Sequence, residues 1–334
     1  MDYINLGKAG VKVSRLCLGT MMFGDATNER DSIKIIHRAM DDGINFIDTA
    51  NVYNNGESEV ILGKALKGRR DRAVVATKVR GARGDGPNDS GTGRVHIFNE
   101  VENSLRRLGT DYIDLYILHQ RDYTTPLEES IEALNDLVRQ GKVRYAGCSN
   151  FYGYELAESL WIADKHNHAP MSAVQPLYNI VNRDAELELF PCCEKYGIGV
   201  MVYSPLARGV LAGKYLPGQA PPPGSRAHRK DPRMMVTETR EESYEVAQEL
   251  KPLADAHGKS MTQFSLNWVL ANPIVTSAIV GPRTMEHYED NIQCLGWEIS
   301  QEALDKIDEL VPPGEHTGWG FNDPQYPVQG RPQG

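Results

Sequence analysis

The sequence predicts an α/β protein, a (β/α)8 barrel of the TIM-barrel class with an N-terminal β-hairpin and additional C-terminal helices. Short apolar runs alternate with helical segments along the chain, giving about eight strand–helix units. The apolar runs are continuous, which is typical of parallel strands that are covered on both faces. About eight such units in 334 residues fit a closed barrel better than an open, doubly wound sheet.

Each expected strand is an apolar run, and an amphipathic stretch follows it. The strands are expected at 15–21, 44–50, 73–79, 113–119, 143–150, 172–179, 199–206 and 276–281. The helices are expected at 29–43, 57–68, 95–109, 126–141, 154–166, 184–197, 240–257, 261–271 and 284–295. Gly43 supplies a stop signal for the first helix. Residues 3–16 are expected to form the hairpin and to plug the bottom of the barrel.

The whole chain, 1–334, is expected to form a single barrel domain, but three of its segments are rich in glycine or proline. Long segments of this kind in a compact domain are usually functional or disordered. Segments 80–94 and 214–233 follow strand ends, so we expect them on the face of the barrel where those strands end. The tail 312–334 carries aromatic residues and is expected to pack, over a substrate pocket at that face, with a frayed end beyond Tyr326 as the alternative.

Composition narrows the class of protein. The net charge is −9, from 36 basic and 45 acidic residues, which disfavours nonspecific nucleic-acid binding. No segment approaches the ~20 consecutive apolar residues of a membrane helix, and the N-terminus lacks a signal pattern. The pair His166 and His168 has no further ligands nearby, so a surface position is favoured over a metal site. The odd number of cysteines without CxxC spacing predicts reduced thiols in the cytoplasm: Cys17, Cys148, Cys192, Cys193 and Cys294.

Four chemically active side chains lie at or just beyond the ends of three consecutive expected strands. These are Asp48 and Tyr53, then Lys78, then His119. The C-terminal ends of barrel strands share one face, and barrel enzymes build their active sites there. Any one of these residues alone could be structural. All four together favour a site for proton transfer.

The chemistry of the four side chains supports this interpretation. A tyrosine has an ordinary pKa of about 10, and a nearby ammonium favours the phenolate and lowers that pKa. Asp48 would fix the Lys78 amine and keep it charged, while His119 could hydrogen-bond a substrate carbonyl or relay a proton. Such a group suits protonation of an oxygen as a hydride reaches its carbon.

Other common catalytic motifs are missing. Glycines at 84, 86, 91 and 93 follow a strand but do not form a GxGxxG sequence that opens a helix. The chain also lacks a P-loop and the GxSxG sequence of many serine hydrolases.

The sequence resembles the aldo-keto reductase family from about residue 3 to about residue 311, as a bacterial-type member with a long loop. The motifs are GINFIDTANVYNNGESE (43–59), ATK (76–78), DLYILH (114–119), GCSN (147–150), QPLYN (175–179), YSPLARGVLAGKY (203–215) and GPRTMEHYEDN (281–291). The resemblance implies that Asp48, Tyr53, Lys78 and His119 form the catalytic tetrad, with Tyr53 as the general acid in reduction.

The resemblance also implies a site for NADPH, with NADH as the alternative. Ser149, Asn150 and Gln175 match residues that hold the nicotinamide carboxamide, and Tyr203 matches the aromatic that stacks on the ring, a core tyrosine being the alternative. Arg283 suits a 2′-phosphate and therefore favours NADPH. The remaining implied contacts are Gly19, Thr20, Met21, Asp48, Ser204, Pro205, Leu206, Gly209, Leu211, Lys214, Gly281, His287, Asp290 and Asn291.

The resemblance therefore implies reversible, NADPH-dependent reduction of an aldehyde or ketone to the alcohol, by a monomer or homo-oligomer without nucleic-acid or membrane partners. The loops expected to line the pocket are Met22–Phe23, Val52, 80–93, 121–125 and the tail, and they leave the substrate open. Segment 214–233 would either fold over the cofactor or remain a solvated linker. Two alternatives remain: a cofactor-binding regulatory subunit that senses redox state, and a Schiff-base enzyme that uses Lys78.

Overall fold

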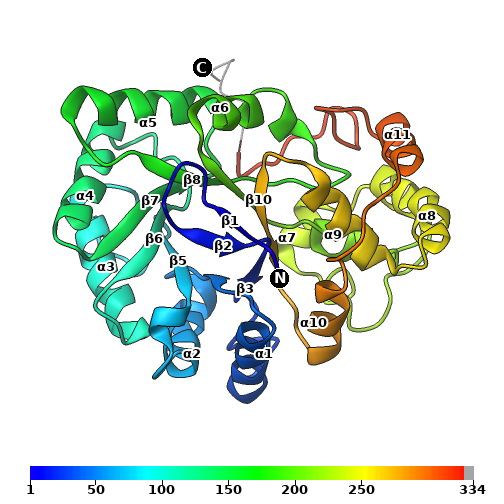
Figure 1. The fold of residues 1–334 in the computed structure, drawn as a ribbon, viewed down its shortest axis with the longest axis horizontal. Helices are drawn as coiled ribbons and strands as arrows, with labels where there is room; N and C mark the ends of the chain where they lie inside the picture. Colours follow the sequence, from blue (N-terminus) through cyan, green and yellow to red (C-terminus); the bar gives the residue numbers. More distant parts are fainter. Residues whose placement is uncertain (327–334) are drawn as a thin grey trace. The chain divides into compact units, whose positions relative to one another are not determined.

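A computed structural model describes residues 1–326, so the last part of the expected tail, 327–334, lies outside the described residues. Eight parallel strands close into a barrel (Figure 1), as the sequence predicts. Going round the barrel, they follow chain order, and the last strand pairs with the first. The strands are β3 (Leu16–Gly19), β4 (Phe46–Asp48), β5 (Val74–Val79), β6 (Ile113–Leu118), β7 (Val143–Ser149), β8 (Met171–Gln175), β9 (Gly199–Val202) and β10 (Val275–Val280).

The described chain divides into two compact units. The barrel unit comprises Met1–Leu177, Glu188–Tyr203 and Asn272–Ile292, and it contains all eight barrel strands. Its helices surround the strands in Figure 1. They are α1 (Glu29–Asp41), α2 (Glu57–Ala65), α3 (Arg94–Leu108), α4 (Leu127–Arg139), α5 (Gly153–His166), α6 (Leu189–Tyr196) and α10 (Met285–Ile292).

The second unit is built from Tyr178–Leu187, Ser204–Ala271 and the chain from residue 293 onward. Its helices are α7 (Pro232–Thr237), α8 (Glu241–Ala256), α9 (Met261–Ala271) and α11 (Gln301–Leu310). The sequence predicts α8 and α9, but α7 begins inside the segment expected to be a loop. Asp231 caps α7 by accepting a hydrogen bond from the Met234 amide, and proline is tolerated at the first helical position.

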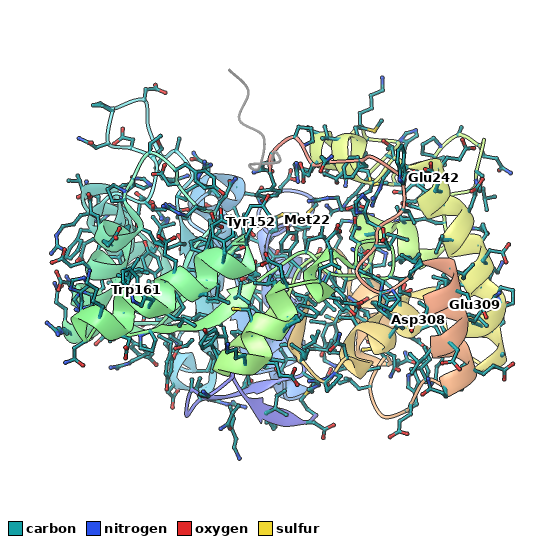
Figure 2. All side chains as sticks on the ribbon, turned by 90° about the horizontal axis from the view of Figure 1, so that it is seen from above. Met22, Tyr152, Trp161, Glu242, Asp308 and Glu309 are labelled. Carbon is teal, nitrogen blue, oxygen red and sulfur yellow. The ribbon has the colours of Figure 1, made fainter. Side chains whose placement is uncertain are left out.

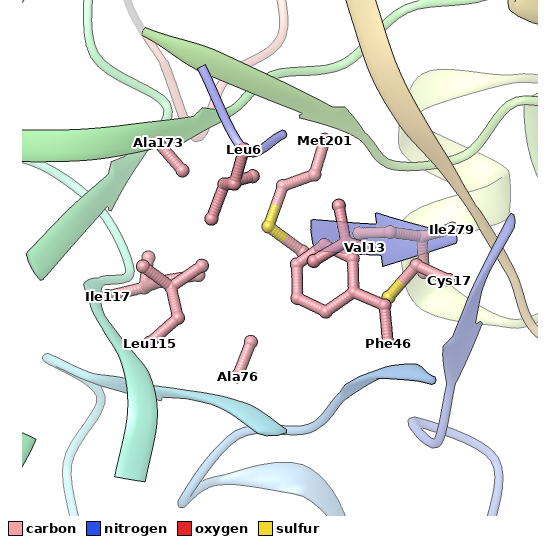
Figure 3. Packing of buried hydrophobic residues seen from close by; sticks show 10 residues of the cluster. All are labelled: Leu6, Val13, Cys17, Phe46, Ala76, Leu115, Ile117, Ala173, Met201 and Ile279. Carbon is pink, nitrogen blue, oxygen red and sulfur yellow. The ribbon is translucent and has the colours of Figure 1, made fainter. Parts of the chain in front are cut away.

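The N-terminal hairpin consists of β1 (Tyr3–Asn5) and β2 (Lys12–Ser14), paired antiparallel. Leu6 and Val13 are fully buried in the same core cluster as barrel residues such as Phe46 and Met201 (Figure 3). Gly7 packs so tightly that an added Cβ would lie 2.4 Å from the Gly197 carbonyl oxygen. The hairpin therefore contributes its apolar side chains to the barrel core, which agrees with the expected plug.

Local signals explain where the helices begin and end. Asn28 accepts a hydrogen bond from the Asp31 amide and caps α1, while Gly43 takes a left-handed φ of 95° just beyond its end.

Helix α5 buries Leu156 and Ile162 against the barrel unit, whereas Trp161 on its outer side is 58% exposed (Figure 2). None of the helices in the described part of the chain has both the length and the apolar character needed to cross a membrane.

The described part of the tail is held within the second unit. The Arg240 guanidinium donates to the Thr317 carbonyl at 2.7 Å and lies 4.8 Å from the centre of the Phe321 ring. Arg233 pairs with Asp323. Trp319 is fully exposed, so the expectation of aromatic packing is met by Phe321 and not by Trp319.

Candidate active site

The barrel brings three members of the expected tetrad into direct contact. The Lys78 ammonium donates to Asp48 Oδ2 at 2.7 Å, to the Thr49 carbonyl at 2.8 Å and to the Tyr53 hydroxyl at 3.1 Å. Asp48 Oδ1 in turn accepts from the Gln175 amide at 2.9 Å. Lys78 is fully buried, while Tyr53 is only partly buried.

Strand register explains why these residues meet. Strands β4 and β5 lie side by side, with Asp48 opposite Ala76, so Lys78 is two residues further along its strand. Strands β5 and β6 pair Lys78 with Ile117 and Val79 with Leu118. The His119 amide then donates to the Val79 carbonyl at 2.9 Å, which places His119 at the same edge. The His119 and Tyr53 rings lie nearly perpendicular to each other, at an interplanar angle of 79°, with ring centres 6.0 Å apart.

The charge of Lys78 is set by two opposing effects. Burial alone would lower the pKa of Lys78, but the charges of Asp48 and Tyr53 and their hydrogen bonds outweigh it. The pKa of Lys78 is therefore raised above its ordinary value, and the amine stays protonated at neutral pH. A Schiff base requires a free amine, so this environment disfavours the Schiff-base alternative.

His119 is a neutral group at this site. Burial, together with the positive charges of Lys78 and Arg80, lowers the pKa of His119 to about 3. A neutral imidazole can donate one hydrogen bond and accept another. His119 is therefore suited to hydrogen-bonding a carbonyl oxygen rather than supplying a proton from an imidazolium ion.

The structure adds supporting residues that the sequence did not single out. Tyr53 lies in a turn whose flanking asparagines are held from outside: the Asn51 amide donates to Glu100 at 2.8 Å, and Arg83 donates to Asn55 at 2.8 Å. Burial alone would raise the pKa of Glu100, but hydrogen bonds from Asn103 and Asn51 and the Arg107 charge keep it below its usual value. Asn51 stands in the motif quoted above. No local sequence pattern indicates that Glu100 supports this turn, because its partner Asn51 is 49 residues away.

Residues implied for the nicotinamide end form one hydrogen-bonded cluster in the barrel unit. The Tyr203 hydroxyl donates to the Asn150 side chain at 2.8 Å, and the Asn150 amide donates to Ser149 Oγ at 2.9 Å and to the His119 carbonyl at 3.0 Å. Ser149 Oγ donates to the Gln175 carbonyl at 2.8 Å. The amides and hydroxyls of this set match the donor and acceptor needs of a carboxamide, so the chemistry of the set fits the expected group.

The residues implied at the end of β3 lie beside Asp48. Thr20 is fully buried, and its amide and hydroxyl donate to the Asp48 carbonyl at 2.9 and 3.0 Å. At Gly19 an added Cβ would lie 2.7 Å from the Ile279 side chain. Met21 is 38% exposed, whereas Phe23, expected in the pocket lining, is fully buried. Phe23 therefore belongs to the core.

The residues implied for the adenosine end lie on or just before α10. Gly281, His287 and Asp290 are at least partly exposed, and Asn291 is buried. The Arg283 carbonyl accepts a hydrogen bond from Thr27 at 2.9 Å, which anchors the segment that leads into the helix. Tyr288 donates to Asp42 at 2.7 Å and fixes α10 against the end of α1.

The segment implied for the pyrophosphate belongs to the second unit and has an unusual backbone. Ser204, Ala207 and Arg208 have φ values of 53°, 45° and 52°, in the left-handed region. At Gly209, with φ of 102°, an added Cβ would lie 3.0 Å from the Lys214 ammonium. The lysine amine therefore lies against this glycine. Pro205 and Leu211 are buried, and Leu206 is partly exposed.

Comparisons with known proteins point to one family. Residues 15–312 match the model of the Aldo/keto reductase family. The chain is 40% identical over 330 residues to the uncharacterized oxidoreductase YrpG of Bacillus subtilis strain 168, covering 95% of this chain and 98% of that protein. It is 33% identical over 317 residues to the aldo-keto reductase YhdN of the same organism, covering 93% and 94%.

A further relative is named for a different role. The chain is 34% identical over 318 residues to a probable voltage-gated potassium channel subunit beta of Oryza sativa subsp. japonica, covering 93% of this chain and 97% of that protein. The family match covers most of the barrel, the implied tetrad meets at one face of it, and the matched relatives include named oxidoreductases. The chain therefore belongs to the aldo/keto reductase family and is an NAD(P)H-dependent oxidoreductase.

Proposed function

We propose that this protein reduces an aldehyde or ketone to the corresponding alcohol with NADPH, in a reversible reaction in which Tyr53 is the general acid. The observation that carries this proposal is the 3.1 Å contact between the Lys78 ammonium and the Tyr53 hydroxyl. A phenol beside a buried ammonium can give up a proton because the remaining phenolate is stabilised by the positive charge.

Each residue then has a distinct task. Tyr53 gives its proton to the carbonyl oxygen, and Lys78 stabilises the phenolate. Asp48 accepts a hydrogen bond from Lys78 at 2.7 Å and holds the amine in position. His119, which is neutral, donates a hydrogen bond that orients the carbonyl. The nicotinamide cofactor, when bound, supplies the hydride, and oxidation of the alcohol uses the same groups in reverse.

The cofactor is proposed to contact residues implied by the family resemblance. Ser149, Asn150 and Gln175 would hold the carboxamide, and Tyr203 would lie against the nicotinamide ring. The segment from Ser204 to Lys214 would contact phosphate, since the Lys214 amine lies against Gly209. Arg283 would pair with a 2′-phosphate, which is why NADPH is preferred to NADH in the proposal. The protein is further proposed to act in the cytoplasm.

A regulatory role is the second candidate function. It is favoured by the relatives named as probable or putative potassium channel beta subunits at 34% to 35% identity. Such a protein would bind cofactor tightly and release product slowly, as one part of a stable oligomer with a membrane partner. The intact contacts among Asp48, Lys78 and Tyr53 give the enzyme role the stronger support.

A panel of carbonyl compounds, assayed by loss of NADPH absorbance at 340 nm, tests the proposal. We expect repeated turnover on at least one aldehyde or ketone, and alcohol formed in equal amount to the NADPH consumed. A single turnover per bound cofactor, with tight retention of the product cofactor, would favour the regulatory role. Absence of any NADPH consumption would contradict the proposed reaction.

A further inference from the structure

Arg80 lies next to the tetrad, and within residues 1–326 its side chain has no hydrogen-bond or ion-pair partner. Arg80 immediately follows β5, two residues beyond Lys78. Val79 and Leu118, the last residues of β5 and β6, are paired. Arg80 and His119, which come directly after them, therefore lie at the same edge of the barrel. The His119 amide donates to the Val79 carbonyl at 2.9 Å and maintains this neighbourhood past the strand ends.

Other arginines in this part of the barrel unit have partners. Arg83 donates to Asn55 at 2.8 Å, Arg107 donates to Glu59 at 2.6 Å, and Arg121 donates to the Thr125 carbonyl at 3.1 Å. In residues 1–326 the Arg80 guanidinium has no hydrogen bond or ion pair, although its backbone carbonyl accepts from the Gly91 amide. Arg80 is partly buried, so its charge is partly removed from water.

Two acidic residues of the neighbouring loops form hydrogen bonds with groups other than Arg80. Asp122 accepts hydrogen bonds from the Thr92 and Thr124 amides at 2.9 and 3.0 Å. Asp89 accepts from the Gly86 amide at 2.9 Å. These carboxylates are therefore already engaged with backbone donors. The positive charge of Arg80 also acts on His119, since it contributes to the lowered pKa of that imidazole after burial and Lys78.

We propose that Arg80 binds an anionic group of the substrate, so that the preferred substrates are aldehydes or ketones carrying a carboxylate or a phosphate. The inference rests on the proposed function, because Tyr53 and His119 fix where the carbonyl lies. A guanidinium binds carboxylate and phosphate through two parallel hydrogen bonds. In a protein of net charge −9, a local cation also offsets long-range repulsion of an anionic substrate.

Matched substrates test this inference. One arm compares 4-carboxybenzaldehyde with its methyl ester, and the other compares glyceraldehyde 3-phosphate with glyceraldehyde, both at saturating NADPH. The wild type should show a higher kcat/KM for the anionic member of at least one pair. Arg80→Gln should lower kcat/KM for that member by ~10- to 100-fold, as expected for loss of a charge-assisted hydrogen bond. The arm that responds identifies the anion.

The neutral member of each pair is the internal control. Its kcat/KM should change less than about twofold in Arg80→Gln, which also shows that the variant is folded. Arg80→Lys, which keeps the charge without the planar fork, should lie between the wild type and Arg80→Gln. Arg139→Gln, at an exposed position on α4, controls for loss of one positive charge and should leave both pairs unchanged.

Two results would overturn the inference. One is an equal loss for anionic and neutral members in Arg80→Gln, which would mark a structural role. The other is a wild type that prefers the neutral member in both arms. If the wild type reduces neutral aldehydes without preferring anions, the proposed function stands and only the role of Arg80 fails. If it reduces no carbonyl compound at all, both fail.

Discussion

Lys78 is fully buried and is nevertheless charged, because Asp48, the Thr49 carbonyl and Tyr53 accept its three hydrogen bonds. Removing one hydrogen-bonding partner of a buried charge leaves that charge uncompensated, which lowers the stability of the folded protein. Asp48, Lys78 and Tyr53 are therefore energetically coupled through these hydrogen bonds. His119 differs from these residues, since burial and then the nearby positive charges lower its pKa and keep it neutral.

The lowered pKa of His119 predicts a pH dependence of stability. The folded pKa is about 3, below the value near 6.5 of an unfolded histidine. Between these values the unfolded chain binds a proton that the folded chain does not, so stability falls as the pH falls. This contribution is intact above about pH 6.5 and is lost progressively towards pH 3.

Urea unfolding of the wild type and of His119→Asn at pH 7 and pH 5.5 measures the effect. The wild type should lose up to about 1.4 kcal/mol more per pH unit than His119→Asn below pH 6.5. His228→Asn, at an exposed position, is the control and should parallel the wild type. Equal pH dependence of the wild type and His119→Asn would contradict a His119 that stays neutral in the folded protein.

At the scale of elements, the turn that carries Tyr53 is held by its neighbours rather than by regular secondary structure. Asn54, Asn55 and Gly56 all have left-handed φ values, of 46°, 55° and 90°. The Asn54 amide donates to the Phe23 carbonyl at 2.7 Å, while Asn51 is bound to Glu100 on α3. The position of the Tyr53 hydroxyl thus depends on contacts from two other segments of the barrel unit.

This arrangement predicts that Asn51→Ala lowers activity as well as stability. Loss of the bond to Glu100 should cost about 1–3 kcal/mol of unfolding free energy and lower kcat by ~10-fold, because the turn no longer positions Tyr53. Asn135→Ala is the matched control: Asn135 is also buried, and it accepts from the Ala169 amide at 3.1 Å, away from the turn. It should lose stability but keep its kcat. An equal loss of kcat in both variants would contradict the role of the turn.

Strands and most helices could be predicted because each is a local pattern: continuous apolar runs for the strands and amphipathic stretches for the helices. The expected helix at 184–197 is instead a short 3-10 turn, Asp184–Glu186, followed by α6. Helix α11 was expected only as one of several C-terminal helices, without a position. Both lie where the pattern is interrupted by loops, so periodicity alone could not define their limits.

The meeting of Asp48, Lys78 and His119 at one edge of the barrel could be predicted because these residues lie at or just beyond the ends of neighbouring strands, and Tyr53 follows in the turn after β4. The supporting contacts could not, since Glu100 and Arg83 reach Asn51 and Asn55 through long-range pairing that leaves no local signal. Nor could the sequence predict that the Arg80 side chain has no hydrogen-bond or ion-pair partner within residues 1–326. The sequence shows an arginine two residues beyond Lys78. Only the structure shows that Asp89 and Asp122, on the neighbouring loops, already accept hydrogen bonds from backbone amides.

At the scale of the whole molecule, the proposed preference for NADPH rests on the positive charge that Arg283 would offer to the 2′-phosphate. Arg283→Ala should weaken NADPH binding by ~10-fold or more and leave NADH binding within about twofold, because only NADPH carries the phosphate that a guanidinium binds. Cofactor titration followed by the thermal shift of the wild type and the variant measures this difference. Equal losses for the two cofactors would reject the role of Arg283.

The central claim is that Tyr53 delivers the proton during carbonyl reduction. The most direct measurement is the kcat of Tyr53→Phe on an aldehyde that the wild type reduces. The NADPH affinity of the same sample is measured by titration. We expect kcat to fall by ~100-fold or more while the NADPH dissociation constant stays within about threefold of the wild type. Turnover that is undiminished in Tyr53→Phe would contradict the account, because it would show that the proton comes from another group.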